Sequence, residues 1–303
     1  MEFRALLVGD VVGKPGRRAL AVALPELLRD HPIDVVIVNG ENSAGGSGIV
    51  PPIFQQFRGL GVDVVTMGDH VYRKKEAVAL LGESDRIIRP ANLPDEAVGR
   101  GWTVLESQSG FPFAVVSLLG RTFMKPADCP FHAVERILES LADGPKLVFV
   151  DLHAEATSDK IAMGWHLDGR VTCVFGTHTH VQTADERVLP KGAAYITDLG
   201  MTGPYDGVLG RKKEKVLHAL VTGMPCHFDV ATGDVRLTGA LVTADTQTGL
   251  ALSIERLSVP VAEPAPARDG AKGEEASAPE PADESGAAES VASRAAEGAD
   301  DSD

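Results

Sequence analysis

The segment that decides the fold reads VTCVFGTHTH (residues 171–180). Its first half is β-branched and apolar, which predicts a buried strand over residues 171–175. Side chains two positions apart on an extended chain point in the same direction, so His178 and His180 can converge beyond the strand end. Neutral imidazole is a common ligand of transition metals. Alone, a His-x-His pair is equally compatible with an ordinary surface or core role.

Polar residues follow several other predicted strands in the same way. Strands are expected at residues 3–9, 34–38, 62–67, 113–119, 146–150 and 193–197, and helices at 17–30, 52–60, 77–81 and 133–141. This alternation indicates an α/β core with helices on its outer faces, in which functional residues gather at the carboxyl ends of strands. The residues at those ends, besides the two histidines above, are Asp10, Glu41, Asn42, Asp69, His70 and His153.

The end of the chain has a different pattern. Short alternating segments at residues 226–230, 235–242 and 250–257 are separated by turn sequences, which predicts antiparallel hairpins. Residues 259–303 contain 12 acidic and three basic residues and no aromatic side chain. Such a segment buries too little apolar surface to offset its ordering entropy. We therefore expect a catalytic domain at residues 1–258, followed by a disordered acidic tail.

The formal net charge of −14 is concentrated in this tail, and the rest of the chain carries only −5. This balance argues against a nucleic-acid groove. No apolar run reaches the roughly 20 residues of a membrane span, and the N-terminus lacks a signal-peptide pattern, so we expect a cytoplasmic protein without a membrane partner. Cys129, Cys173 and Cys226 lie far apart without a CxxC spacing, so neither a disulfide nor a zinc knuckle is expected.

The strand-end residues combine carboxylates, an amide and imidazoles without a thiolate. Mixed oxygen and nitrogen ligands suit Mn²⁺, Fe or Zn²⁺. The candidate ligands are more than one ion needs, so two metals sharing a bridging carboxylate are the simplest interpretation. Two metals about 3.5–4 Å apart, with a hydroxide between them, can attack phosphorus in line. His70 would then be free to act as the general acid that protonates the leaving oxygen.

The ordered motifs resemble those of the calcineurin-like metallophosphoesterases, and more closely the YmdB-type bacterial branch. The resemblance covers roughly residues 3–257 and leaves out the tail. Its motifs are the Asp10 loop, NGEN at 39–42, GDH at 68–70, RPAN at 89–92, GRTF at 120–123, DLHAEATS at 151–158, GTHTHVQTAD at 176–185 and MTGPYDG at 201–207.

The resemblance implies a four-layer αββα sandwich with a small cap segment near the site. It also implies two iron or manganese ions and phosphodiesterase activity on a small-molecule substrate, a 2′,3′-cyclic nucleotide. Glu41 would bridge the two metals, and His70 would be the catalytic acid. The remaining ligands would be Asp10, Asn42 and His180 for the first metal, and Asp69, His153 and His178 for the second. No substrate-binding residue follows from the resemblance.

One position departs from the family pattern. The third strand end reads Gly-Asn-His in the family and Gly68-Asp69-His70 here. The carboxylate adds a negative charge beside a site that must accept a phosphate anion. We expect Asp69 to bind the metal more tightly than an amide, to weaken substrate attraction, and to favour a more highly charged ion such as Fe³⁺.

Other interpretations of these residues stay open. Asp10 and Asp69 would also suit helix N-caps, Glu41 a solvated turn, and His153 a place in the core. The same chemistry could serve a phosphomonoesterase or a protein phosphatase. A third interpretation is a regulatory protein that senses a nucleotide and signals through a protein contact. A homo-oligomer is one option for the assembly.

Overall fold

The computed structural model describes residues 1–262, which fold around two β-sheets. The first sheet consists of β1 (Glu2–Val8), β2 (Asp10–Val11), β3 (Val35–Asn39), β4 (Val64–Thr66), β5 (Ile87–Ile88), β12 (Met201–Pro204), β13 (Val235–Asp245) and β14 (Ala251–Pro260). Its strand order is β2-β12-β13-β1-β3-β4-β5, with β14 paired to β13. Strands β1, β3, β4 and β5 are parallel, whereas β13 lies antiparallel to β1 and β14.

The second sheet consists of β6 (Trp102–Glu106), β7 (Pro112–Leu119), β8 (Leu147–His153), β9 (Cys173–Thr177), β10 (Arg187–Val188) and β11 (Ala194–Ile196). Its strand order is β10-β11-β9-β8-β7-β6. Strands β7, β8, β9 and β11 are parallel, and the two edge strands are antiparallel to their neighbours. The carboxyl ends of β8 and β9 therefore lie side by side.

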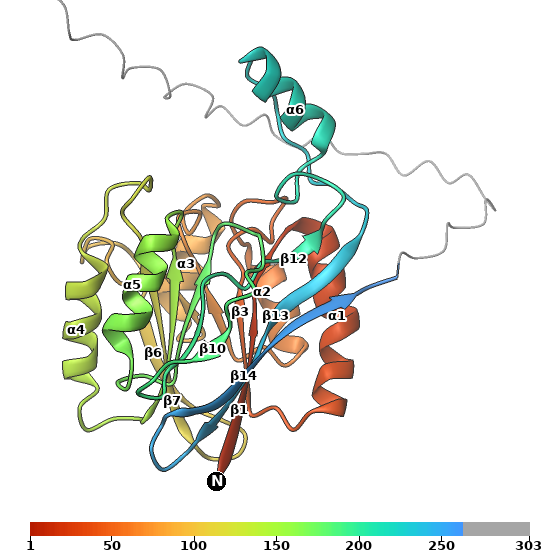
Figure 1. Cartoon of the computed structure of the whole chain (residues 1–303). Helices are drawn as coiled ribbons and strands as arrows, with labels where there is room; N and C mark the ends of the chain where they lie inside the picture. The colour runs from red at the N-terminus through yellow and green to blue at the C-terminus, as the bar shows by residue number, and fades with distance from the viewer. Residues whose placement is uncertain (263–303) are drawn as a thin grey trace, which may run out of the picture. The chain divides into compact units, whose positions relative to one another are not determined.

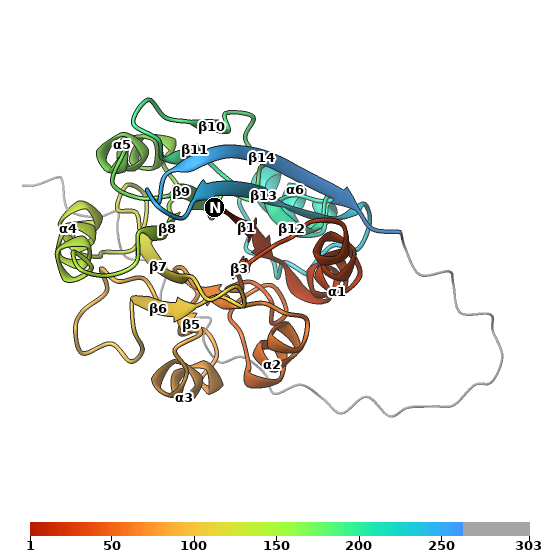
Figure 2. The same cartoon turned by 90° about the horizontal axis from the view of Figure 1, so that it is seen from below.

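Helices cover the outer face of each sheet (Figures 1 and 2). Helices α1 (Gly13–Asp30), α2 (Pro51–Gly59) and α3 (Glu76–Glu83) pack on the first sheet, whereas α4 (Pro130–Ser140) and α5 (Thr157–Leu167) pack on the second. Helix α6 (Lys213–Thr222) projects away from both sheets and buries none of its residues (Figure 1).

The alternation of side chains along the strands explains these layers. In β1, Phe3 and Leu7 pack into the core between the sheets, and Leu6 and Val8 pack under the helices. Because successive strand residues point to opposite faces, a strand that is apolar throughout must be covered on both sides. The predicted four-layer αββα sandwich is confirmed.

The segment between β12 and β13, residues 205–234, carries α6 and corresponds to the predicted cap. Its Arg211 side chain donates a hydrogen bond to the Gly46 carbonyl at 2.6 Å, in the loop that follows β3. The cap is therefore attached to the loop that contains Glu41.

One predicted strand is absent. Residues 226–230 belong to the cap, where Val230 makes only an isolated bridge to Arg211 because the cap offers no further strand for pairing. Helix α1 begins at Gly13 rather than at residue 17, since the glycine-rich turn forms its first turn. The sequence also did not predict the helices α5 and α6 or the short strands β2, β5, β6, β10 and β12.

Strand β14 reaches slightly into the segment expected to be a tail. Strand β14 ends at Pro260, so its final two residues belong to the predicted range 259–303. The rest of that range, from residue 263, lies outside the described residues. Within residues 1–262, none of the helices has the length and apolar character needed to cross a bilayer.

Candidate metal centre

The strand-end residues predicted from the sequence meet at the carboxyl edges of the two sheets. Parallel neighbouring strands bring their carboxyl ends to the same edge, which is why residues far apart in sequence become neighbours. Asp10 opens β2, Glu41 and Asn42 follow β3, Asp69 and His70 follow β4, His153 ends β8, and His178 and His180 follow β9.

Four of these residues form a compact cluster of potential ligand atoms. Glu41, Asp69, His153 and His178 each offer one such atom, and the four atoms all lie within 4.8 Å of one another. The Nε2 atom of His153 lies 3.2 Å from Glu41 Oε1 and 3.3 Å from Asp69 Oδ1. The same atom lies 3.0 Å from His178 Nδ1.

Hydrogen bonds behind His153 fix the role of its Nδ1 atom and the orientation of its ring. Thr177 Oγ1 donates its hydrogen to Asp151 Oδ1 at 2.7 Å, so it acts as the acceptor toward His153 Nδ1, 2.9 Å away. Burial raises the pKa of Asp151 to about 6, so at neutral pH this carboxylate accepts the bond. Nδ1 of His153 is therefore protonated and donates to Thr177, which leaves Nε2 as the atom that faces the cluster.

The donor set fits a metal ion. The Nε2 atom of His153 and the facing carboxylate oxygens need a cation between them, which is either a proton on the ring or a metal ion that replaces it. Burial alone lowers the pKa of His153, but the carboxylates of Glu41 and Asp69 raise it well above its usual range. The same negative charge attracts a metal ion, and oxygen and nitrogen ligands suit manganese, iron or zinc.

A second group of predicted ligands also contacts Glu41. The Oδ1 atom of Asp10 lies 3.7 Å from His180 Nε2 and 3.5 Å from Asn42 Nδ2. Glu41 Oε1 lies 3.3 Å from Asn42 Nδ2, in addition to its contact with His153. The fully buried carboxylate of Glu41 thus touches members of both groups.

Asn42 and His70 contact each other at the edge of this second group. Asn42 turns its amide nitrogen toward Asp10 and His180, and an amide nitrogen does not bind metals, so ligation by its oxygen requires a flip of the amide. In the present orientation the oxygen lies 2.8 Å from His70 Nδ1. The other ring nitrogen of His70, Nε2, lies 3.8 Å from Asp69 Oδ2. The His70 side chain is 25% exposed.

The charges of the two groups compensate one another. Burial alone raises the pKa of Asp10, but the neighbouring His180 lowers it below its usual range. Burial alone lowers the pKa of His180, but Asp10 raises it by more, so the pKa of His180 lies above its usual value. Burial and the adjacent His153 lower the pKa of His178, which keeps its ring neutral and suited to metal binding.

The loop that carries the two histidines is strained. His178 and His180 have φ angles of 94° and 63°, which lie in the left-handed region that residues other than glycine rarely adopt. A buried ion pair supports the loop, because Lys160 Nζ lies 2.7 Å from Asp198 Oδ2. The same carboxylate oxygen accepts a hydrogen bond from Thr179 Oγ1 at 2.6 Å, which holds the residue between the two histidines.

Gly68 allows the cluster to form. A Cβ atom at this position would collide with the His153 ring and with the Glu41 carboxylate. Only glycine leaves room for this close approach of β4 to the ligand atoms.

Two further partners of the histidine rings were not predicted from the sequence. Glu155 Oε2 lies 3.1 Å from His178 Nε2, and the carbonyl oxygen of Leu209 accepts a hydrogen bond from His180 Nδ1 at 3.1 Å. Partners of this kind orient a ligating imidazole through its second nitrogen. The position of Glu155 two residues after His153, in the motif at 151–158, was a usable signal. Leu209 acts through its backbone and leaves no sequence signal.

Comparisons with known proteins point to one family. The profile of the family described as YmdB-like protein matches residues 6–257. The 2′,3′-cyclic-nucleotide 2′-phosphodiesterase of Bacillus subtilis (strain 168) is 44% identical over 257 residues, which cover 85% of this chain and 97% of that protein.

Two crystal structures share the fold. One is a hypothetical protein from Thermus thermophilus with 40% identity and a TM-score of 0.80, covering 85% of this chain and 99% of that one. The other is a novel phosphatase from Mycoplasma pneumoniae with 33% identity and a TM-score of 0.81, covering 86% of this chain and 94% of that one. On the family profile and this level of identity, the chain belongs to the YmdB-like protein family.

Proposed function

We propose that this protein is a phosphodiesterase that hydrolyses 2′,3′-cyclic nucleoside monophosphates at a site for two metal ions, iron or manganese. The observation that carries the proposal is the position of Glu41, whose Oε1 atom lies 3.2 Å from His153 in one group and 3.3 Å from Asn42 in the other. A carboxylate that touches two ligand groups is suited to bridge two metals. The name of the Bacillus subtilis relative supports the substrate class.

Each group would hold one ion. Bound metal ions would lower the pKa of the attacking water and neutralise the phosphate oxygens. Glu41 would be shared, and Asn42 would contribute its oxygen after the amide flip. The ligands of the first ion would be Asp10, Asn42 and His180, and those of the second Asp69, His153 and His178.

His70 is suited to protonate the leaving oxygen. Its Nδ1 atom faces the Asn42 amide, whose oxygen lies 2.8 Å away here and whose nitrogen would take that place after the flip. Either contact leaves Nε2, on a partly exposed ring, to transfer a proton. In hydrolysis the bond between phosphorus and the 2′ oxygen breaks, the oxygen of water stays on phosphorus, and the 2′ oxygen takes the proton. The product is a nucleoside 3′-monophosphate.

Metal analysis of anaerobically purified protein, combined with a panel of cyclic nucleotides, tests the proposal. Glu41→Gln should reduce the bound metal and abolish turnover of 2′,3′-cyclic nucleotides, because the bridge is lost. Glu135→Gln makes the same change on α4, where the carboxylate pairs with Arg170 on the surface, and should behave as wild type. Full turnover by Glu41→Gln would refute the proposal.

Activity on phosphomonoesters is a second candidate, favoured by the Mycoplasma pneumoniae neighbour described as a novel phosphatase. Turnover of cyclic and linear phosphate esters by the same preparation distinguishes the two, since the proposed diesterase should prefer the cyclic ester. If Glu41→Gln loses activity and the cell keeps its phenotype, a nucleotide-sensing role gains support instead.

The effect of Asp69 in place of the family asparagine stays a prediction. Its Oδ1 atom lies 3.3 Å from His153 Nε2, so the carboxylate is positioned to share a metal with that ring. We expect Asp69→Asn to bind metal more weakly and to attract the phosphate anion more strongly. Unchanged metal content together with unchanged kcat/KM would contradict this. A cytoplasmic location and a homo-oligomeric assembly likewise stay predictions.

A further inference from the structure

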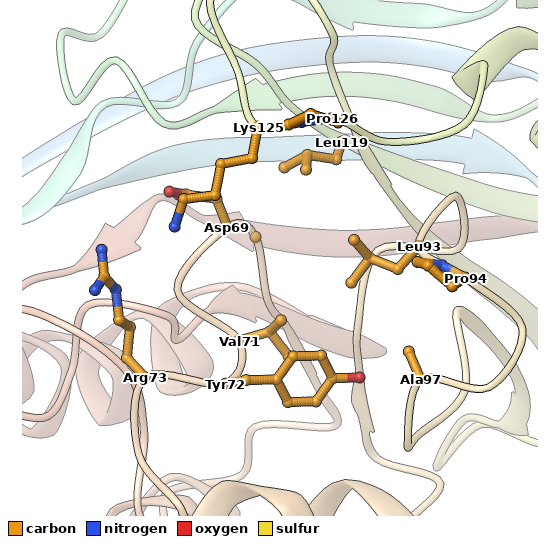
Figure 3. Close-up of a pocket in the computed structure, with 11 residues that line it drawn as sticks. Asp69, Val71, Tyr72, Arg73, Leu93, Pro94, Ala97, Leu119, Lys125 and Pro126 are labelled. Carbon is orange, nitrogen blue, oxygen red and sulfur yellow. The ribbon is translucent and has the colours of Figure 1, made fainter. Parts of the chain in front are cut away.

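A cavity of about 410 Å³ opens directly beside the metal centre. Asp69, one of the clustered carboxylates, is part of its lining, together with residues that follow it before α3. The rest of the lining comes from the loop after β5 and from the end of β7 with the loop that follows it (Figure 3). This volume lies in the range of pockets for small organic ligands, about 300–1,000 Å³.

The cavity has a polar and an apolar side. Figure 3 shows Asp69, Arg73 and Lys125 on one side of the view, and Leu93, Pro94 and Ala97 on the other. The polar side is the one that contains the candidate metal ligand. A molecule with a charged group at one end and an apolar, flat group at the other therefore matches the lining.

Both cations on the polar side of the cavity are free to bind an anion. Within residues 1–262, the side chains of Arg73 and Lys125 form no ion pair and no hydrogen bond. Such cations beside Asp69 offset the negative charge that this residue adds to the site. A phosphate group at the metal centre would lie within their field.

Tyr72 supplies an aromatic ring to the cavity wall. Its hydroxyl donates a hydrogen bond to the Val98 carbonyl at 2.5 Å, which anchors the ring, and the residue remains 38% exposed. Figure 3 shows the hydroxyl turned toward the side where Ala97 lies. A ring that is held in place and lines an open cavity can stack on a nucleobase at little entropic cost.

From this geometry we propose that the cavity is the nucleoside subsite of the enzyme. Tyr72 stacks on the base, the side formed by Leu93 and Pro94 encloses it, and Arg73 and Lys125 attract the phosphate toward the metal centre. This assignment rests on the proposed function, because it presumes that the substrate is a nucleotide. It adds the residues that distinguish a cyclic nucleotide from a cyclic phosphate without a base.

The first experiment compares two five-membered cyclic phosphodiesters, 2′,3′-cyclic AMP and glycerol 1,2-cyclic phosphate. The ratio of their kcat/KM values measures what the base contributes. Tyr72→Ala should lower this ratio about tenfold, since stacking of a base on an aromatic side chain is worth about 1–3 kcal/mol. Tyr72→Phe keeps the ring and should restore the ratio. Trp165→Ala, which removes an exposed ring from α5, should leave it unchanged.

The second experiment tests the two cations. Arg73→Met combined with Lys125→Met should raise KM for both cyclic esters about tenfold and weaken the dependence of kcat/KM on salt, because both substrates carry the phosphate anion. Lys75→Met removes an exposed positive charge from the same segment, outside the cavity, and serves as the matched control.

A binding measurement separates the subsite from catalysis. Adenosine, which lacks a phosphate, should bind to the metal-free protein and bind about tenfold more weakly to Tyr72→Ala, as measured by equilibrium dialysis. If wild type hydrolyses both cyclic esters and Tyr72→Ala changes neither the ratio nor adenosine binding, the subsite assignment is wrong and the proposed function stands. If wild type hydrolyses neither ester with metal bound, the proposed function itself fails.

Discussion

Replacing Thr177 by valine removes one hydroxyl from the buried hydrogen bonds behind His153. That hydroxyl accepts from His153 Nδ1 at 2.9 Å and donates to Asp151 Oδ1 at 2.7 Å, and all three residues are fully buried. Valine has a similar shape, so the substitution creates almost no cavity. It leaves His153 Nδ1 and Asp151 Oδ1 without this partner and removes a longer contact of 3.4 Å from Asn39 Nδ2. The proton on Nδ1 loses its acceptor, and the ring loses the contact that keeps Nε2 directed at the cluster.

The magnitude follows from these contacts. A buried group left without its hydrogen bond costs about 1–3 kcal/mol, so the unfolding free energy of the metal-free protein should fall by about 2–4 kcal/mol. Loss of a partner that orients a ligating histidine typically weakens metal binding about 10–100-fold. At a fixed excess of metal, this reduces the stabilisation that the metal provides by about 1.4–2.7 kcal/mol.

Thr172→Val is the matched control. Thr172 is also fully buried next to β9, where its hydroxyl accepts from the Val148 amide at 2.9 Å and donates to the Gly249 carbonyl at 2.7 Å. Both variants should lose similar stability in urea unfolding without metal. Only Thr177→Val should bind metal more weakly in a competition titration with a chelator. Equal metal affinity in wild type and Thr177→Val, or an equal loss of metal affinity in both variants, would refute the reasoning.

Three further predictions concern the support of the site and a buried thiol. Lys160→Met leaves the Asp198 carboxylate buried without its cation, so urea unfolding at pH 7 should show a loss of about 3–5 kcal/mol, and a loss below about 1 kcal/mol would contradict the role of this ion pair. Gly68→Ala should reduce bound metal strongly, whereas Gly59→Ala, at a position with open space, should retain it; equal metal content in the two variants would show that the crowding at Gly68 is unimportant. Burial raises the pKa of the Cys173 thiol, so a disulfide reagent at pH 8 should modify the two other cysteines in the native protein and Cys173 only after unfolding, and immediate reaction of all three would disagree with its burial.

The local pattern of apolar and polar residues was sufficient to predict most of the buried strands and the candidate metal ligands. Runs of apolar residues identified most of the buried strands, because strands covered on both faces must be apolar throughout. The polar residues that end these strands identified the candidate ligands, because parallel strands bring their carboxyl ends to one edge. His178 and His180 could be singled out without knowledge of any contact, and the motifs around them indicated the family and therefore the four-layer sandwich.

Only the tertiary structure decided which residues support and surround those ligands. The hydrogen bonds from Thr177 to Asp151, the ion pair of Lys160 with Asp198, and the cavity beside Asp69 each join segments that are separate in sequence. The strand expected at residues 226–230 fails for the same reason, since its alternation is typical of a strand but the cap provides no strand beside it. The periodicity of a segment indicates which secondary structure it can form. Its actual pairing and packing depend on which other segments the completed fold places next to it.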